Sequence, residues 1–464
     1  GMDPDLGGPA APGLWFDGLP DPVRRRPRLD GDATADVVIV GAGFTGLWTA
    51  YALLGRSPSI RVLVVEAATV GYGASGRNGG WASALFAARR QDLARHGGPE
   101  AVRAQHRAMV AAIDDIARVC AEERIDCGFH RGGTLTVSRS PAQDGRVRGV
   151  VDDHVRWGLG PEHPIELDRD ACDRRIRVRG TRFGVHTPDC ARIDPARLVV
   201  GLAEAVERRG GIIRERTPVI DLLPDGIRTG CGTVRAPITV LATEAWTSTL
   251  PGQRRRSIPV YSLMVATEPL SADTWSEIGW DGRETLTDGR NLIVYAQRTP
   301  DDRIAFGGRG APYHFGSRID PRYDRDPATF RALESTLHDL FPMLRGRPIT
   351  HRWGGPLGVP RDWHSGVGIA RDRSFAWAGG YVGDGVTTAN LAGRTLADLI
   401  LGEDTELTRL PWVGHRSRRW EPEPMRWLAV RSMTALARGA DRVEARTGRT
   451  ARLRSALLRS LTGH

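Results

Sequence analysis

The sequence predicts an α/β protein whose Rossmann-like nucleotide-binding domain is assembled from separated segments of the chain. An apolar run at residues 37–40 leads into a glycine-rich turn, and a second run at 60–65 ends at an acidic residue, which is the pattern of a βαβ dinucleotide-binding unit. Alternating apolar and polar residues at 257–267 and 291–307 predict an inserted antiparallel-sheet domain. A helical extension is expected at the C-terminal end.

The first unit is expected to bind the phosphates and the ribose of a dinucleotide. Gly41 permits the tight turn, Gly43 lets the backbone approach a pyrophosphate, and Gly46 lets the next helix pack closely on the strand. The N-terminus of that helix offers free N–H groups to phosphates. Glu66, at the end of the second strand, is placed to accept hydrogen bonds from ribose hydroxyls. A glycine-rich turn without a ligand is the weaker alternative in this full context.

The loop at 71–80 is too rich in glycine to form a regular element, and loops of this kind commonly wrap a ligand. Apolar residues at helical spacing then predict a helix at 99–123, and alternation predicts a strand at 133–138. Residues 140–185 are polar and carry no clear pattern. The remaining expected elements are a helix at 195–209, strands at 212–222, 227–234, 238–242 and 375–380, and a closing helix at 385–401.

These elements divide the chain into two domains with an extension at each end. The N-terminal arm is rich in proline, glycine and arginine, and its apolar residues 14–16 are expected to anchor it on the core. The expected segments are 34–127, 186–250 and 350–404 for the nucleotide-binding domain, 128–185 and 251–349 for the inserted substrate domain, 1–33 for the arm and 405–464 for a basic helical tail.

The composition narrows the chemistry. A length of 464 residues allows about two to three domains. No apolar run approaches the roughly 20 residues of a membrane span, and no signal-like segment is found. Five cysteines without a CxxC pair argue against a disulfide framework or a zinc site and favour a cytoplasmic protein without a metal. All 65 basic residues are arginine, which excludes Schiff-base, pyridoxal phosphate and Walker-type lysine mechanisms.

The net charge of +10 is concentrated in the tail, where residues 405–464 contain 13 arginines and five acidic residues, a balance of +8. We expect this segment to dock on its own domain as a surface helix. Contact with a membrane surface is the alternative. Nucleic acid is not expected as a partner, because no nucleic-acid-binding motif accompanies the charge.

Five motifs occur in an order that is recognisable as a whole. They are GAGFTG at 41–46, GASGRNGG at 73–80, VLATEAW at 240–246, VATEPL at 265–270 and GGYVGDGV at 379–386. Together they resemble the FAD-dependent amine oxidoreductases of the D-amino-acid oxidase superfamily, which includes glycine and sarcosine oxidases. The glycine loop is most similar to the gamma-glutamylputrescine oxidase branch, and the resemblance spans residues 34–404.

The resemblance implies a bound FAD. Glu66 would contact the adenosine ribose, Val219 would offer backbone contacts to adenine, and the glycines near Asp384 would meet the flavin ring, aided by the dipole of the following helix. For Arg77, a plain salt bridge made by the loop is the alternative to a phosphate contact. The full set of implied cofactor residues is Gly41, Gly43, Phe44, Thr45, Gly46, Glu66, Ala74, Ser75, Arg77, Asn78, Gly79, Gly80, Val219, Ala242, Gly383, Asp384, Gly385 and Val386.

Departures from the family pattern are also informative. The Cys and His positions that carry a covalent flavin in some relatives are not matched here, so FAD is expected to bind non-covalently. The arginines that hold a substrate carboxylate in glycine oxidases are missing after Trp353 and next to Tyr381, and Thr387 stands where sarcosine oxidases have lysine. A cationic or polyamine-like amine is therefore expected rather than a free amino acid, with Asp384 near the flavin. A helix-capping role for Asp384 is the alternative.

The expected reaction is hydride transfer from a C–N centre to flavin N5, followed by hydrolysis of the imine to an aldehyde. Trp81, Tyr261, Tyr295 and Tyr381 are candidates for an aromatic box around the ammonium group. Oxygen is the expected acceptor, with Arg309 or Arg318 supplying the positive charge that a lysine gives in relatives. The alternatives are a dehydrogenase that passes electrons to a quinone at a membrane surface, and a flavin-binding protein without turnover.

Overall fold

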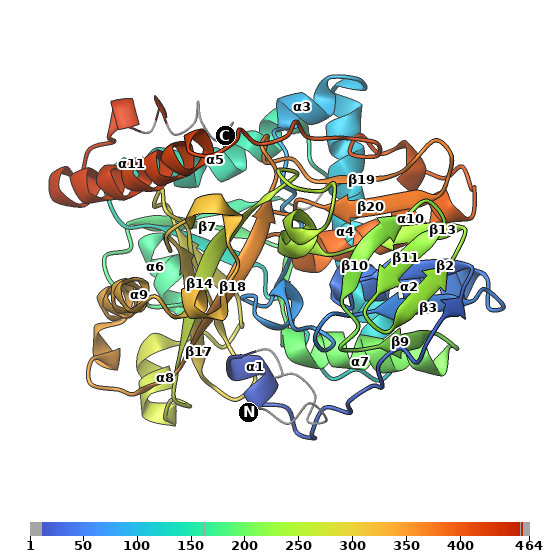
Figure 1. The fold of residues 1–464 in the computed structure, drawn as a ribbon. Coiled ribbons are helices and arrows are strands. Elements are labelled where there is room, and N and C mark those ends of the chain that lie inside the picture. Colours follow the sequence, from blue (N-terminus) through green and yellow to red (C-terminus); the bar gives the residue numbers. More distant parts are fainter. Residues whose placement is uncertain (1–11, 161–162, 455, 458–464) are drawn as a thin grey trace.

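A computed structural model describes residues 12–160, 163–454 and 456–457. It has the α/β fold predicted from the sequence, with a mainly parallel sheet and a larger, mainly antiparallel sheet packed side by side (Figure 1). The short helix α1 (Leu14–Asp17) is buried, so the arm is anchored where the sequence predicted.

The first sheet carries the βαβ unit. Its strands are parallel except for an antiparallel strand, β19, at one edge. In spatial order they are β19 (Gly366–Ile369), β20 (Phe375–Gly379), β13 (Ile238–Leu241), β2 (Val37–Val40), β3 (Val62–Val65) and β9 (Ile212–Arg214).

This sheet is covered on both faces, which explains why its strands are apolar throughout. Val37 and Ile39 face a core shared with the helices, whereas Val38 and Val40 face a smaller sheet, because successive strand side chains point to opposite faces. The helices on the first face are α2 (Phe44–Arg56), α4 (Gly98–Glu122), α7 (Pro195–Arg208) and α10 (Gly385–Ile400). The smaller sheet contains β1 (Ala33–Thr34), β12 (Gly232–Arg235), β11 (Gly226–Thr229) and β10 (Val219–Leu223).

The second sheet has eight strands and one parallel pair, β5 with β15. Its longest strand, β18, pairs along its length with β14, so residues 350–359 belong to this sheet and not to the nucleotide-binding sheet, where the expected boundary at 350 put them. The strand order is β18 (Ile349–Val359), β14 (Ile258–Thr267), β17 (Ile304–Arg309), β16 (Val294–Arg298), β15 (Thr285–Asp288), β5 (Thr134–Ser138), β7 (Phe183–Thr187) and β6 (Ile165–Asp168).

The region without a clear sequence pattern, 140–185, contains regular elements after all. It forms the helix α5 (Pro141–Trp157), strand β6 and the helix α6 (Arg169–Arg175). Few residues of α5 are buried, among them Val147 and His154, which is why its apolar periodicity is weak. The remaining elements are α3 (Arg90–Ala94), α8 (Ala272–Ile278), α9 (Pro327–Leu340) and a two-stranded sheet of β4 (Trp81–Ser83) and β8 (Cys190–Arg192).

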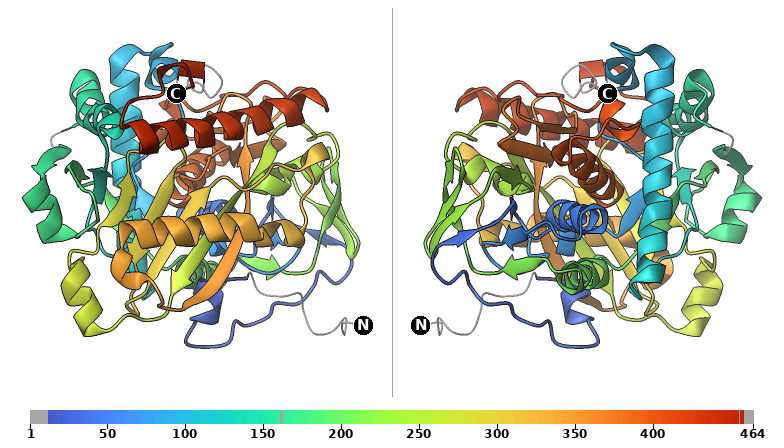
Figure 2. Two further views of the ribbon diagram at one scale, coloured as in Figure 1. Left: turned by 90° about the vertical axis from the view of Figure 1, so that its left-hand side faces the viewer. Right: turned by 90° about the vertical axis from the view of Figure 1, so that its right-hand side faces the viewer.

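The basic tail docks on its own chain, as the sequence led us to expect. Its helix α11 (Met425–Thr447) crosses the molecule beside α5 (Figures 1 and 2). Val430 and Met433 are buried against residues of the second sheet, including Ile258. Among the described residues, no helix is long and apolar enough to cross a bilayer.

Candidate functional site

A cavity of 390 Å³ lies at the carboxyl ends of strands β2 and β3, beside the N-terminus of α2. This is the place where open α/β sheets bind nucleotides. Thirteen of the residues expected to contact the cofactor line it: Gly41, Gly43, Phe44, Thr45, Glu66, Ala74, Ser75, Asn78, Val219, Ala242, Gly383, Gly385 and Val386. The sequence motifs, which are far apart along the chain, thus meet around one space.

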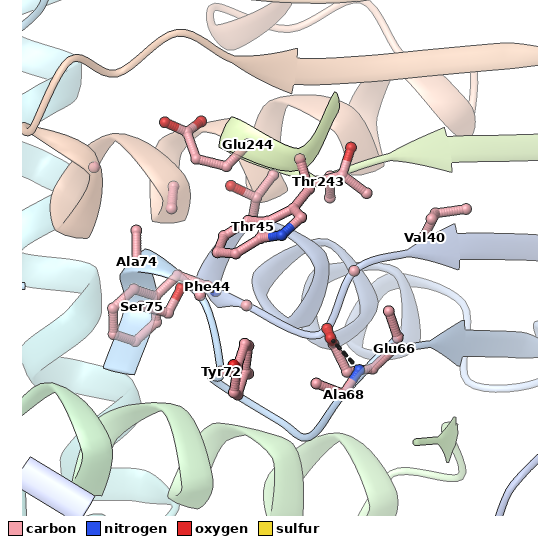
Figure 3. A pocket seen from close by; sticks show the side chains of 18 of the residues that line it. Val40, Phe44, Thr45, Glu66, Ala68, Tyr72, Ala74, Ser75, Thr243 and Glu244 are labelled. Carbon is pink, nitrogen blue, oxygen red and sulfur yellow. Dashed lines mark hydrogen bonds between the residues drawn. The ribbon is translucent and has the colours of Figure 1, made fainter. Parts of the chain in front are cut away.

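Glu66 is held at one end of this cavity by backbone hydrogen bonds. Its carboxylate accepts from the N–H of Ala42 at 2.9 Å. It also accepts from the N–H of Ala68 at 3.0 Å (Figure 3). Burial raises the pKa of Glu66, while these amides oppose the rise. The carboxylate is therefore oriented before any ribose arrives.

The glycines of the turn allow close backbone packing. A side chain at Gly41, where φ is +112°, would collide with the carbonyl of Ala242, and one at Gly46 would collide with the carbonyl of Gly41. Gly46 thus supports the turn from behind the cavity, as the βαβ pattern implied. At Gly43 a Cβ atom would lie 2.8 Å from Ser75 Oγ. The donors and the open backbone of this cavity suit a dinucleotide pyrophosphate.

The glycine loop braces itself and the neighbouring helix. Ser75 Oγ accepts a hydrogen bond from Phe44 N–H at 2.8 Å, at the first turn of α2. Asn78 donates to the carbonyls of Ala74 and Ser75, both at 3.0 Å, and accepts from Gly80 N–H. The side chains of Ser75 and Asn78 therefore shape the cavity wall by fixing the loop.

Arg77 has a different environment from the pyrophosphate contact implied by the family resemblance. Its guanidinium is buried, donates to Asp324 at 2.7 Å and to the carbonyl of Gly354 at 3.0 Å, and does not line the first cavity. Burial raises the pKa of Asp324 to about 6 even though Arg77 lies beside it. These contacts favour the loop salt bridge, which was the alternative for Arg77.

Several lining residues were not singled out from the sequence. Glu244 follows β13, and its Oε1 accepts from Gly358 N–H at 3.1 Å while its Oε2 is buried without a partner among the described residues. Burial raises its pKa to about 7. Tyr72 and Trp246 also line the cavity. Glu244 and Trp246 lie inside the VLATEAW motif, so the motif identified the segment but not the side chains.

A second cavity, of 870 Å³, adjoins the first. The two share lining residues at Ala74, Asn78, Leu357, Gly383 and Val386. Gly79 lines only the second cavity, beneath the ring of Tyr295, whereas Gly80 is held at the loop junction, where its carbonyl accepts from Ile193 N–H at 2.8 Å.

Two of the four expected aromatic residues line the second cavity. Trp81 and Tyr295 pack edge to face with centroids 6.3 Å apart, and the Tyr295 hydroxyl lies 2.6 Å from Ser262 Oγ. Tyr381 instead lines the first cavity and bonds Thr45 Oγ1 at 2.7 Å. Tyr261 is buried in the second sheet, packed against His314 and Tyr323. A four-residue aromatic box is therefore not formed by these positions.

Asp384 and Arg309 both line the second cavity. Asp384 lies at the N-cap position of α10, yet its side chain makes no capping hydrogen bond, so the helix-capping alternative is not supported. Burial raises the pKa of Asp384 to about 7, and the nearby Arg309 opposes the rise. Burial in turn lowers the pKa of Arg309. Arg318 is exposed and lies away from both cavities, which removes it as a source of charge at the flavin.

The second cavity also contains polar residues that the sequence did not reveal. They come from α3, α4, α5 and the segment before β16, and include Arg90, His106, Arg146, His154, Asp153, Asp288 and Arg290. Burial lowers the pKa of His106 to about 4, so this ring is neutral near pH 7. Most of these residues fall in stretches without a recognisable motif. No cluster of metal-binding side chains occurs in the part of the chain that the structure describes.

Comparisons with known proteins agree with this geometry. The profile of the family described as FAD dependent oxidoreductase (DAO) matches residues 36–399. The gamma-glutamylputrescine oxidoreductase of Escherichia coli is 28% identical over 403 residues, 84% of this chain and 91% of that protein. A probable oxidoreductase OrdL of Rhizobium meliloti is 29% identical over 425 residues, 87% of this chain and 91% of that protein. Glycine oxidase from Geobacillus kaustophilus has the same fold, with a TM-score of 0.70 at 20% identity, over 83% of this chain and 100% of that one.

Proposed function

The chain belongs to the FAD dependent oxidoreductase family, and from this premise we propose that it oxidises a C–N bond in a cationic, polyamine-like amine. FAD would bind non-covalently, with its ribose at Glu66 and its ring where the two cavities meet, near Gly383. When bound, the flavin would accept a hydride, which carries two electrons, from the substrate carbon. The side chains around the cavities would carry out the other steps of the reaction.

The observation that carries the amine proposal is the position of Asp384. Its carboxylate faces the second cavity beside the shared wall, and it makes no hydrogen bond with any residue that the structure describes. A carboxylate in this state is available to attract an ammonium group and hold its nitrogen near the flavin. The name of the Escherichia coli relative, a gamma-glutamylputrescine oxidoreductase, points to the same class of substrate.

The bound ammonium group must lose one proton from nitrogen to become a neutral amine, which then loses a hydride from carbon and becomes a protonated imine. With a pKa of about 7, Asp384 is able to receive the proton of the bound ammonium group. Water then adds to the imine carbon, and the C–N bond breaks to give an aldehyde and the released amine or ammonia. Trp81 and Tyr295 form an apolar wall that limits water around the reacting atoms.

Arg309 is the candidate for the fixed positive charge beside the flavin. Its guanidinium lines the second cavity next to Asp384. A positive charge there stabilises the anionic reduced cofactor and the negative charge that develops on oxygen during reoxidation. This supports oxygen as the acceptor in a chain without lysine.

Anaerobic bleaching of the flavin tests the proposal directly. The purified protein should be yellow, should release FAD on denaturation, and should lose its flavin absorbance when polyamines or monoacylated diamines are added without oxygen. Bleaching by D-amino acids or N-methyl amino acids instead would contradict the substrate class. No bleaching by any amine or amino acid would favour a flavin-binding protein without turnover.

A quinone-linked dehydrogenase is the second candidate, and the outer side of α11 favours it. Met425 and Leu428 are exposed there among arginines, an arrangement that suits the surface of an anionic membrane. Release of hydrogen peroxide during turnover in air separates the two candidates. Turnover with a dye acceptor but without peroxide would support the dehydrogenase.

A further inference from the structure

A third cavity of 1050 Å³ lies between the second cavity, which we call the substrate cavity, and α11. We call it the outer chamber. Val430, Met433, Thr434 and Ala437 of α11 form part of its wall. This helix follows residue 399, where the match to the family profile ends, so this wall lies outside the part of the chain that the profile covers.

The helix is fixed in this position by polar contacts at the chamber. Asp441 accepts hydrogen bonds from the N–H groups of Asn291 at 2.8 Å and Leu292 at 3.0 Å. Glu444 is buried and pairs with Arg146 at 2.6 Å. Buried charged pairs of this kind hold one geometry, so α11 is a defined wall of the chamber.

The outer chamber and the substrate cavity share a boundary that includes Asp384. Arg90, Arg146, Arg290 and Arg309 line both spaces. A molecule whose amine lies at Asp384 therefore has room to extend past these arginines toward α11. The combined space is much larger than a small amine requires, which favours an elongated substrate.

The charges around the outer chamber favour a negative group at the far end of that substrate. Its lining contains six arginines (Arg89, Arg90, Arg95, Arg146, Arg290 and Arg309) and three aspartates (Asp92, Asp153 and Asp384).

Arg90 has hydrogen-bond donors without partners, unlike Arg146 and Arg290 on this boundary. Arg146 is paired with Glu444, and Arg290 with Asp288. Arg90 contacts Asp153 through Nε alone, at 3.3 Å, and its two terminal nitrogens make no hydrogen bond with any described residue. Its side chain is 18% exposed, so these donors are shielded from most of the solvent.

We infer that the outer chamber is a distal substrate subsite, in which Arg90 binds a carboxylate carried by the end of the amine that does not react. The terminal nitrogens of a guanidinium match the two oxygens of a carboxylate. This inference rests on the proposed amine oxidation. It adds that the substrate has a positive end for Asp384 and a negative end for Arg90.

Two amines that differ only in the distal charge test the inference. The holoenzyme is assayed with N-succinylputrescine and with its neutral isohexanoyl analogue, which replaces the carboxylate by an isosteric branched end. We expect kcat/KM to be higher for the succinyl compound by about tenfold or more. Equal values for the two compounds would overturn the inference while leaving amine oxidation intact. If neither compound is turned over and neither bleaches the flavin, the result would count against both the distal subsite and amine oxidation.

Variants of Arg90 test whether this residue causes the preference for the succinyl compound. Arg90→Gln should raise KM for the succinyl compound much more than KM for the isohexanoyl compound, and Arg90→Lys should keep part of the preference. Arg107→Gln, on the exposed side of α4, is the matched control. A variant that loses bound FAD is detected by its absorbance. If Arg90→Gln retains FAD and the full preference, Arg90 does not bind the carboxylate.

The position of α11 gives an independent test. Thr434→Phe places a ring in the chamber, whereas Ala435→Phe places the same ring on the exposed side of the next residue. Thr434→Phe should weaken oxidation of both acylated putrescines and spare butylamine, and Ala435→Phe should change none of the three. Equal loss for butylamine and the acylated compounds would show that the chamber is not a distal subsite.

Discussion

The Glu66 carboxylate accepts a hydrogen bond from the backbone N–H of Ala42 at 2.9 Å, which joins the end of β3 to the glycine turn after β2. The acidic group and the turn are therefore positioned as one unit. A ribose bound at Glu66 and a pyrophosphate bound at the turn would be aligned by the same contact.

Replacing Glu66 by glutamine should weaken FAD binding because it removes a charged acceptor from the ribose and one acceptor oxygen from the turn. A loss of about 1–3 kcal/mol is expected, equivalent to about a fivefold to 150-fold rise in Kd. Titration of the apoprotein with FAD, followed by quenching of flavin fluorescence, measures this change. Asp221→Asn, at an exposed ion pair, is the control, and an unchanged Kd for Glu66→Gln would exclude the ribose contact.

A second prediction distinguishes the two roles considered for Arg77, a salt bridge and a phosphate contact. Arg77→Met leaves Asp324 buried without its partner, so we expect a loss of about 3–5 kcal/mol in the free energy of unfolding. Asp324→Asn added to Arg77→Met should recover much of that loss, because the uncompensated charge is removed. Thermal unfolding of the holoenzyme measures both effects.

FAD affinity in that double variant is the decisive value. If Arg77 supports the loop through its salt bridge, the folded double variant should bind FAD with nearly normal affinity. A stable double variant with strongly reduced affinity would restore the phosphate contact that the family resemblance implied.

Arg309 should act on reoxidation. Arg309→Met removes the positive charge beside the flavin, and we expect the reaction of reduced enzyme with oxygen to slow by about 10²-fold. Stopped-flow mixing of the photoreduced enzyme with oxygenated buffer measures this step separately from amine oxidation. Arg318→Met, at an exposed position, is the matched control. An unchanged oxygen rate would mean that Arg309 has no part in reoxidation.

Much of the first cavity, which we assign to the cofactor, could be predicted from local sequence because it is built from rigid backbone features. Gly41, Gly43 and Glu66 were predictable, since a βαβ turn allows few residue types at those positions. The substrate cavity was less predictable. Tyr261 is an apolar-patterned strand residue that packs inward. Arg90 and His106 are helix residues whose position at the second cavity depends on how α3 and α4 pack against distant strands. Such long-range packing leaves no local pattern.

Arg77 shows a further limit of prediction from the sequence. Its motif predicted the path of the loop, but its partner Asp324 lies 247 residues away in sequence, in a segment that carries no motif. The edge of the second sheet was misplaced for a related reason. The expected boundary at 350 put β18 in the nucleotide-binding domain. The glycines of β18 instead let it pack closely on β14, since a Cβ at Gly354 would meet Leu263.

Asp384 gives a prediction about pH. Burial raises its pKa to about 7, so the carboxylate is charged, and attracts an ammonium group, only above that pH. We expect kcat/KM for a cationic amine to rise through about pH 7, and Asp384→Asn to lose this step and to raise KM. Steady-state assays over pH with Asp225→Asn, an exposed position, as control measure both effects. A pH profile that keeps the step in Asp384→Asn would assign it to another group.

The same raised pKa fixes the sign of a stability effect that does not depend on turnover. An unfolded aspartate ionises near pH 3.8, so between that pH and about 7 the folded protein binds more protons than the unfolded chain, and stability falls as pH rises. Above about pH 7 the buried charge is present at its full cost. Asp384→Asn removes the cost, so its gain in Tm over the wild-type protein should be larger at about pH 8 than at about pH 5. An equal gain at both values would show that Asp384 ionises normally in the folded protein.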